Sequence, residues 1–154
     1  MLRAHGVKRV VDVRTIPRSR TNPQFNRESL TESLAEAGIG YTHAAALGGL
    51  RHARKDSFNT GWRNASFRGY ADYMQTPEFE AAITALIENA KSEQVTIMCA
   101  EAVPWRCHRS LIGDALKVRG IAVADIMSAT RTQPHELTSF AKVEGTQVTY
   151  PAAE

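Results

Sequence analysis

Short apolar runs alternate along the chain with longer stretches in which apolar residues recur every three or four positions. The short runs are rich in β-branched and aromatic residues and predict strands, at residues 9–13, 39–43, 95–99 and 121–126. The stretches with the longer period predict amphipathic helices, at residues 27–37, 67–74, 77–90 and 106–119. Strands that alternate with helices in this way predict parallel strands joined by helical crossovers.

Capping residues mark several of these boundaries. Asn26 precedes the first helix and Gly38 follows it, and Thr76 with Pro77 is a usual cap and first position for the third. Beyond residue 126 we expect a short helix over 134–142 and an edge strand over 147–150. The expected fold is a single α/β domain over residues 1–154, with a mostly parallel, Rossmann-like sheet of four to five strands covered by helices.

Polar residues follow the predicted strands at their carboxyl ends. Open parallel sheets bind ligands beyond this edge, where the loops from strand to helix meet. The residues selected by this rule are Asp12, Arg14, His43, Cys99 and Glu101. We therefore expect Asp12, Arg14, Cys99 and Glu101 to line one concavity, together with Arg109 of the following helix.

Positive charge is concentrated in the first half of the chain. The net charge is +3, but the first 70 residues hold twelve Lys and Arg against five Asp and Glu. A basic rim would attract phosphate or carboxylate groups, and its binding to a polyanion would weaken as salt rises. The candidate substrate-binding residues are Arg14, Arg18, Arg20, His43, Arg106, His108 and Arg109.

The two cysteines, Cys99 and Cys107, have three interpretations. We find no signal peptide, and no apolar run approaches the length of roughly 18 residues needed to span a membrane. We therefore expect a cytoplasmic protein with no membrane contact. A structural disulfide is not expected in that compartment. Cys99 precedes a helix start, as do the nucleophiles of phosphatases and rhodaneses, but burial and Glu101 oppose thiolate formation. The remaining interpretations are a small buried residue and a metal ligand.

Two carboxylates, Asp12 and Glu101, provide the groups needed for general acid and base catalysis. For Glu101 the alternatives are hydrogen bonds to a ribose and a salt bridge to Arg14, Arg106 or Arg109 that ties the strands together. The candidate metal ligands near Asp12 and Glu101 do not have the sequence spacing of a standard zinc site. We therefore expect neither a bound metal nor a cofactor. The candidate catalytic residues are Glu101, Asp12 and Cys99.

The chain resembles the family named domain of unknown function 488. The resemblance rests on motifs in the family's order: Val11-Asp-Val-Arg14, Pro17-Arg-Ser-Arg20, Phe25, Gly38-Ile-Gly-Tyr41, His43, Leu47-Gly-Gly49, Tyr73-Met74, Met98-Cys-Ala-Glu101, Cys107-His-Arg109 and Pro134-His135. It implies the α/β fold expected above and carries no established activity. Family members usually begin with a Thr-Ile-Gly-His-Ser-like strand, so the resemblance also implies that this strand is missing before Met1.

Together these features predict an enzyme, or an enzyme-derived protein, that acts on a phosphate-bearing substrate such as a nucleotide or nucleic acid. A non-catalytic nucleotide- or nucleic-acid-binding module would use the same basic rim. A cysteine-dependent phosphatase or sulfurtransferase is the third hypothesis. The sequence does not specify the reaction or the oligomeric state.

Overall fold

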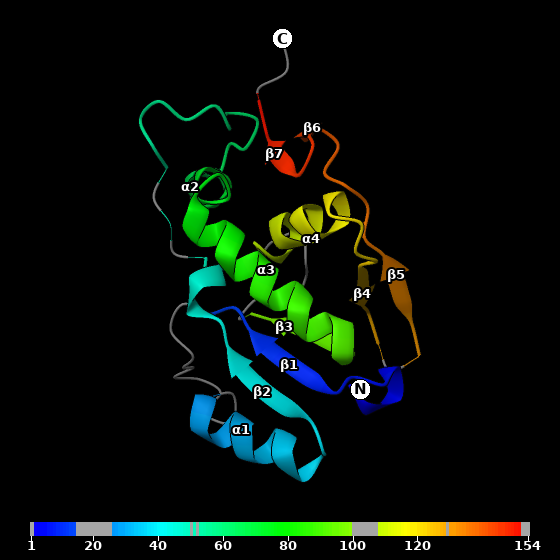
Figure 1. Cartoon of the computed structure of the whole chain (residues 1–154). Coiled ribbons are helices and arrows are strands. Elements are labelled where there is room, and N and C mark those ends of the chain that lie inside the picture. The colour runs from blue at the N-terminus through cyan, green and yellow to red at the C-terminus, as the bar shows by residue number, and fades with distance from the viewer. Residues whose placement is uncertain are drawn as a thin grey trace.

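The computed structural model describes residues 2–14, 26–49, 51, 53–99, 108–128 and 130–151. Within these ranges, a central sheet consists of three parallel strands in the order β2-β1-β3. They are β1 (Arg9–Asp12), β2 (Gly40–His43) and β3 (Val95–Met98). Asp12 pairs with His43 on one side and Met98 on the other. The three strands therefore end level with one another at one edge of the sheet (Figure 1).

Strand β1 is buried on both faces, as its uninterrupted apolar run predicts. Successive side chains of a strand point to opposite faces, so Val10 and Val11 enter different clusters. Val10 packs with residues of α1 (Arg27–Glu36), and Val11 belongs to the larger core with residues of α3 (Pro77–Ser92) and α4 (Arg109–Val118). Figure 1 shows α1 on one face of the sheet and α3 and α4 on the other.

Local capping explains where several helices begin and end. The side chain of Asn64 accepts hydrogen bonds from two backbone amides at the start of α2 (Ala65–Tyr73). The predicted cap and first position of α3 are confirmed, since the Thr76 hydroxyl accepts from the Phe79 amide and Pro77 is the first helical residue. Gly38, after α1, has a φ of +77°, a left-handed conformation that favours glycine. Two short 3-10 helices, η1 (Arg3–His5) and η3 (Ala45–Leu47), complete the helical elements described.

The segment after α4 departs from the predicted fold. β4 (Ala124–Ile126) pairs antiparallel with β5 (Thr132–Pro134), outside the central sheet, so the predicted fourth parallel strand is wrong. The helix expected over 134–142 is also wrong, because Pro134 ends a strand and no helix follows it. A nearby antiparallel partner needs only a short loop, whose closure costs little entropy. The pattern of apolar residues predicted a strand in this segment but did not indicate which other strand it pairs with.

The last strand is present but also lies outside the central sheet. β6 (Lys142–Glu144) and β7 (Gln147–Thr149) form an antiparallel hairpin. In the described part of the chain the fold is thus a mixed α/β structure with a small parallel sheet and two antiparallel pairs, rather than a Rossmann-like sheet of four to five strands. None of the described helices has the length and apolar character needed to cross a membrane.

A buried network fastens the carboxyl-terminal segment to α4. Asp114 is fully buried, and its carboxylate accepts hydrogen bonds from His135 Nε2 (2.9 Å), the Thr138 amide (3.1 Å) and the Tyr150 hydroxyl (2.8 Å). Burial and the neighbouring carboxylate raise the pKa of Tyr150, so its hydroxyl remains a donor. Three segments that are distant in the sequence therefore share one buried acceptor.

Gly69 in α2 lies against the backbone of the loop that follows η3. A Cβ at this position would approach the Arg51 carbonyl oxygen and lie 2.8 Å from the Ala53 nitrogen. Gly69→Ala should lower the free energy of unfolding by about 1–2 kcal/mol, because overpacking outweighs the gain in helix propensity. Urea denaturation followed by circular dichroism measures this change, with Ser66→Ala on the exposed side of α2 as control. Equal stability of the two variants would contradict the close packing.

Candidate functional site

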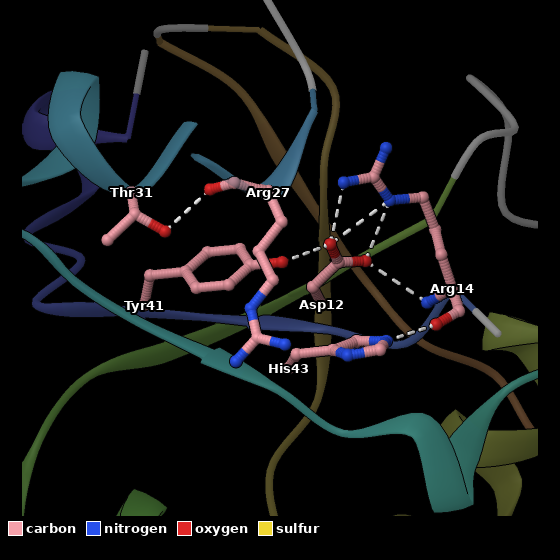
Figure 2. Close-up of polar contacts among 6 residues, drawn as sticks. All are labelled: Asp12, Arg14, Arg27, Thr31, Tyr41 and His43. Atoms are coloured by element: carbon pink, nitrogen blue, oxygen red, sulfur yellow. Dashed lines mark hydrogen bonds and ion pairs between the residues drawn. The ribbon is translucent and has the colours of Figure 1, made fainter. Parts of the chain in front are cut away.

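The site begins with an ion pair at the end of β1. Arg14 Nε lies 2.9 Å from Asp12 Oδ1, Arg14 Nη2 lies 2.7 Å from Oδ2, and the Arg14 backbone amide donates to Oδ1 at 3.1 Å. Figure 2 shows the guanidinium facing the carboxylate with two of its nitrogens. Asp12 has no exposed surface and Arg14 is 7% exposed. The pair is therefore a buried, bidentate contact whose orientation is tightly restricted.

Tyr41 completes the coordination of the Asp12 carboxylate. Its hydroxyl donates to Asp12 Oδ2 at 2.6 Å. Burial would raise the pKa of Asp12, but the hydrogen bonds from Arg14 and Tyr41 outweigh burial and hold it below its usual range. Burial and the bond to Asp12 raise the pKa of Tyr41 to about 12. At neutral pH the group thus consists of a carboxylate, a guanidinium and a neutral hydroxyl.

His43 lies on the same face of β2 as Tyr41, two residues further along the strand. Its Nε2 is 2.7 Å from the backbone carbonyl oxygen of Arg14, as Figure 2 shows. A carbonyl oxygen can only accept a hydrogen bond, so Nε2 carries the proton and Nδ1 of the neutral ring has a free lone pair. His43 is half-buried. The contact with the backbone fixes the ring beside the buried ion pair.

His108 brings the start of α4 to the same edge of the sheet. Its Nε2 is 3.1 Å from the carbonyl oxygen of Val13, and its ring centroid is 4.9 Å from that of Tyr70. Burial lowers the pKa of His108, and hydrogen bonds to the backbone of Val13 and Leu47 oppose this only in part. A Cβ at position 49 would lie 2.7 Å from His108 Nδ1. Glycine at that position therefore leaves room for the imidazole ring.

Arg27 is the first residue of α1 and has an exposed side chain. Figure 2 shows this side chain extending from the helix toward Tyr41 and His43. Its guanidinium has no hydrogen-bond or ion-pair partner among the residues that the structure describes. The edge of the sheet thus combines a neutralised, buried arginine, Arg14, with a second arginine, Arg27, whose charge is not paired within the described part of the chain.

A family model described as "Domain of unknown function DUF488" matches residues 1–116. This chain belongs to the DUF488 family. The matched region includes the three strands of the parallel sheet and all the residues just described. No curated protein and no solved structure matches the chain. The DUF488 match therefore covers the sheet edge, whose chemistry is inferred from its geometry.

The structure of this DUF488 protein brings together several residues that the strand-end rule selected. Asp12, Arg14 and His43 are in direct contact, and Cys99 follows Met98, whose carbonyl accepts from the Val13 amide. The predicted partners Arg18, Arg20, Glu101 and Arg106 lie outside the described residues. Arg109 begins α4 and has a buried Nε. The concavity that these residues were expected to line stays a prediction.

The expectation of a reduced thiol at Cys99 is wrong in this structure. Cys99 is disulfide-bonded, and Cys107, the one other cysteine of the sequence, lies outside the described residues. Cys99 is half-buried and packs against the large core. The expectation of a reduced thiol is based on the redox state of the cytoplasm. The redox state does not determine whether two sulfur atoms lie within bonding distance.

Sequence reasoning missed two members of the site, Tyr41 and Arg27. Tyr41 could have been found from its spacing, because residues two apart on a strand point to the same face and His43 was already selected. Arg27 has a weaker signal. It occupies the first helical position after Asn26, where a cation is unfavourable next to the positive end of the helix dipole.

Proposed function

We propose that this DUF488 protein binds a phosphate-bearing molecule, a nucleotide or a nucleic acid, at the carboxyl edge of β1 and β2. We further propose that it is an enzyme, or derives from one, that acts on this molecule. The observation that carries the proposal is the exposed guanidinium of Arg27, which has no partner among the described residues and extends toward Tyr41 and His43 in Figure 2. Parallel α/β sheets bind their ligands at this edge.

The charge balance of the edge favours an anionic ligand. Asp12 neutralises Arg14, so the buried pair contributes little net charge. Arg27 adds a positive charge at the amino end of α1, where the helix dipole is also positive. Glu28 in the same turn is exposed and offsets this only in part. A phosphate group beside Arg27 would offset the unfavourable interaction between the Arg27 charge and the positive end of the helix dipole. It would also accept charge-assisted hydrogen bonds from the guanidinium.

The geometry suggests a separate role for each group. Asp12 has both carboxylate oxygens occupied and no exposed surface, so we assign it to positioning Arg14 and Tyr41 rather than to proton transfer. His43 has an Nδ1 lone pair that can accept a proton or a hydrogen bond from the ligand. Glu101 remains the proposed acid or base.

The thiol-dependent hypothesis loses support from the state of Cys99. A disulfide-bonded sulfur provides no thiolate, so a phosphatase or sulfurtransferase would first require reduction of this bond. A non-catalytic binding module would use the same residues as the proposed enzyme. Chemical conversion of a bound nucleotide, followed by chromatography, distinguishes the two.

Arg27→Ala should weaken binding of a nucleotide about tenfold, the loss expected for a charged hydrogen-bond partner. Isothermal titration with adenosine, AMP and ADP measures this, and adenosine should bind more weakly than AMP because it lacks the phosphate. Arg131→Ala removes the same charge from an exposed position between β4 and β5 and serves as control. Equal losses in the two variants, or equal binding of adenosine and AMP, would refute the proposed site.

A further inference from the structure

Phe58 is 72% exposed, more than any other large apolar side chain in the described residues. Exposure of an aromatic ring is costly, because burying such a side chain is worth roughly 1.5–3 kcal/mol. It lies outside the parallel sheet, in the loop between η3 and α2. The hydrogen bonds of the neighbouring residues show whether the ring is exposed because the loop is mobile or because an ordered loop holds it in solvent.

The residues on both sides of Phe58 are fastened to one buried carboxylate. Asp72 of α2 accepts hydrogen bonds from the Ser57 hydroxyl at 2.6 Å, the Asn59 side-chain amide at 2.7 Å and the Arg54 backbone amide at 2.8 Å. Asp72 is 5% exposed and Asn59 is fully buried. The loop therefore has a defined conformation at the residues directly before and after Phe58.

A second contact ties the loop to the carboxyl-terminal segment. The Tyr150 amide donates to Asn59 Oδ1 at 2.8 Å, and the Gly61 amide donates to the Tyr150 carbonyl oxygen at 2.8 Å. With its neighbours held from two sides, Phe58 cannot reach the core by a local rearrangement alone. The structure thus holds an aromatic ring in solvent on an ordered loop.

The sequence around this ring is strongly basic. Residues 51–72 hold five Lys and Arg against two acidic residues, Asp56 and Asp72. This excess of three positive charges equals the net charge of +3 for the whole chain. Arg54 is paired with Asp56, whereas Lys55 and Arg63 are exposed and have no side-chain partner among the residues described. An aromatic ring that is close in the sequence to Lys55 and Arg63 could stack on a base while these cations contact phosphates, as in proteins that bind single-stranded nucleic acid.

We propose that the segment from Arg54 to Arg63, here called the Phe58 loop, binds single-stranded nucleic acid. A base stacks on the ring of Phe58, and Lys55 and Arg63 contact the neighbouring phosphates. Single strands fit better than a duplex, because a base must be unstacked from its neighbours to lie on the ring. This surface is distinct from the nucleotide site at the sheet edge, and its binding does not require Arg27.

Fluorescence anisotropy with a labelled oligouridylate of about 12 nucleotides tests the proposal. Phe58→Ala should weaken binding about tenfold and Phe58→Trp should preserve it, since base stacking is worth about 1–3 kcal/mol. Lys55→Ala should weaken binding and make it less dependent on salt. Val143→Ala removes an apolar side chain that is 41% exposed elsewhere and should have no effect.

The same variants separate this proposal from the proposed nucleotide site. Phe58→Ala should leave AMP binding unchanged. Phe58→Ala should still lower oligouridylate affinity about tenfold when it is added to Arg27→Ala, because the two sites are independent. Unchanged oligonucleotide affinity in Phe58→Ala would overturn the proposal, as would tighter binding of a duplex of the same length. Absence of any oligonucleotide binding by the folded wild-type protein would also overturn it, even if AMP binds at the sheet edge.

Discussion

Asp12→Ala is expected to lower the free energy of unfolding by about 3–5 kcal/mol, the cost of breaking a buried ion pair by removing one partner. The variant leaves Arg14, whose side chain is 6% exposed, without its counter-ion. It also leaves the Tyr41 hydroxyl without the acceptor that it contacts at 2.6 Å. Urea denaturation of the purified protein, followed by circular dichroism, measures the loss.

The chain provides a matched control for this substitution. Asp56 and Arg54 form an ion pair with the same two-residue separation, but their side chains are 72% and 59% exposed. Water solvates both charges in this pair, so Asp56→Ala should cause no measurable change in stability. If the two alanine variants were equally stable, burial would not be the source of the effect. A double replacement of Asp12 and Arg14 by apolar residues should recover part of the loss, because it leaves no buried charge unpaired.

The Asp12 contribution also predicts a dependence on pH. The native pKa of Asp12 is lower than that of the unfolded chain, because hydrogen bonds from Arg14 and Tyr41 outweigh the effect of burial. The contribution is then complete above the unfolded pKa and is lost as pH falls through the native pKa. Wild type should lose stability on acidification below about pH 4, and Asp12→Ala should lose less over the same range.

Asp114→Ala is expected to have an effect of similar size, about 3–5 kcal/mol, on the free energy of unfolding. The substitution leaves three donors without an acceptor, from His135, Thr138 and Tyr150. Tyr150→Phe removes only one donor and should cost about 1–2 kcal/mol. Hydrogen exchange should then show faster exchange in β6 and β7 in Asp114→Ala than in Tyr150→Phe. Equal stability of the two variants would show that Asp114 does not act as the shared acceptor.

The two networks have different origins in the sequence. Asp12 and Arg14 are two residues apart at the end of a recognisable buried strand, so the sequence indicates that both lie at the same edge of the sheet. Asp114, His135 and Tyr150 come from segments that no local pattern relates. Asp114 lies within an amphipathic helix, where an acidic residue is normally expected on the solvated face. The approach of His135 and Tyr150 explains why this carboxylate can be buried.

The sequence by itself determined the α-helices and parallel strands described up to residue 118 and the edge of the sheet at which polar residues gather. These features follow from local rules, because side-chain periodicity, helix caps and the direction of parallel strands act over a few residues. Tertiary structure alone decided that β4 pairs with β5, that Asp114 is buried, and that the Arg27 side chain extends toward the edge of β2 in Figure 2. Each of these outcomes depends on which distant segments come into contact. The periodicity of apolar residues indicates which side chains are buried. It does not indicate which distant segment each of them packs against.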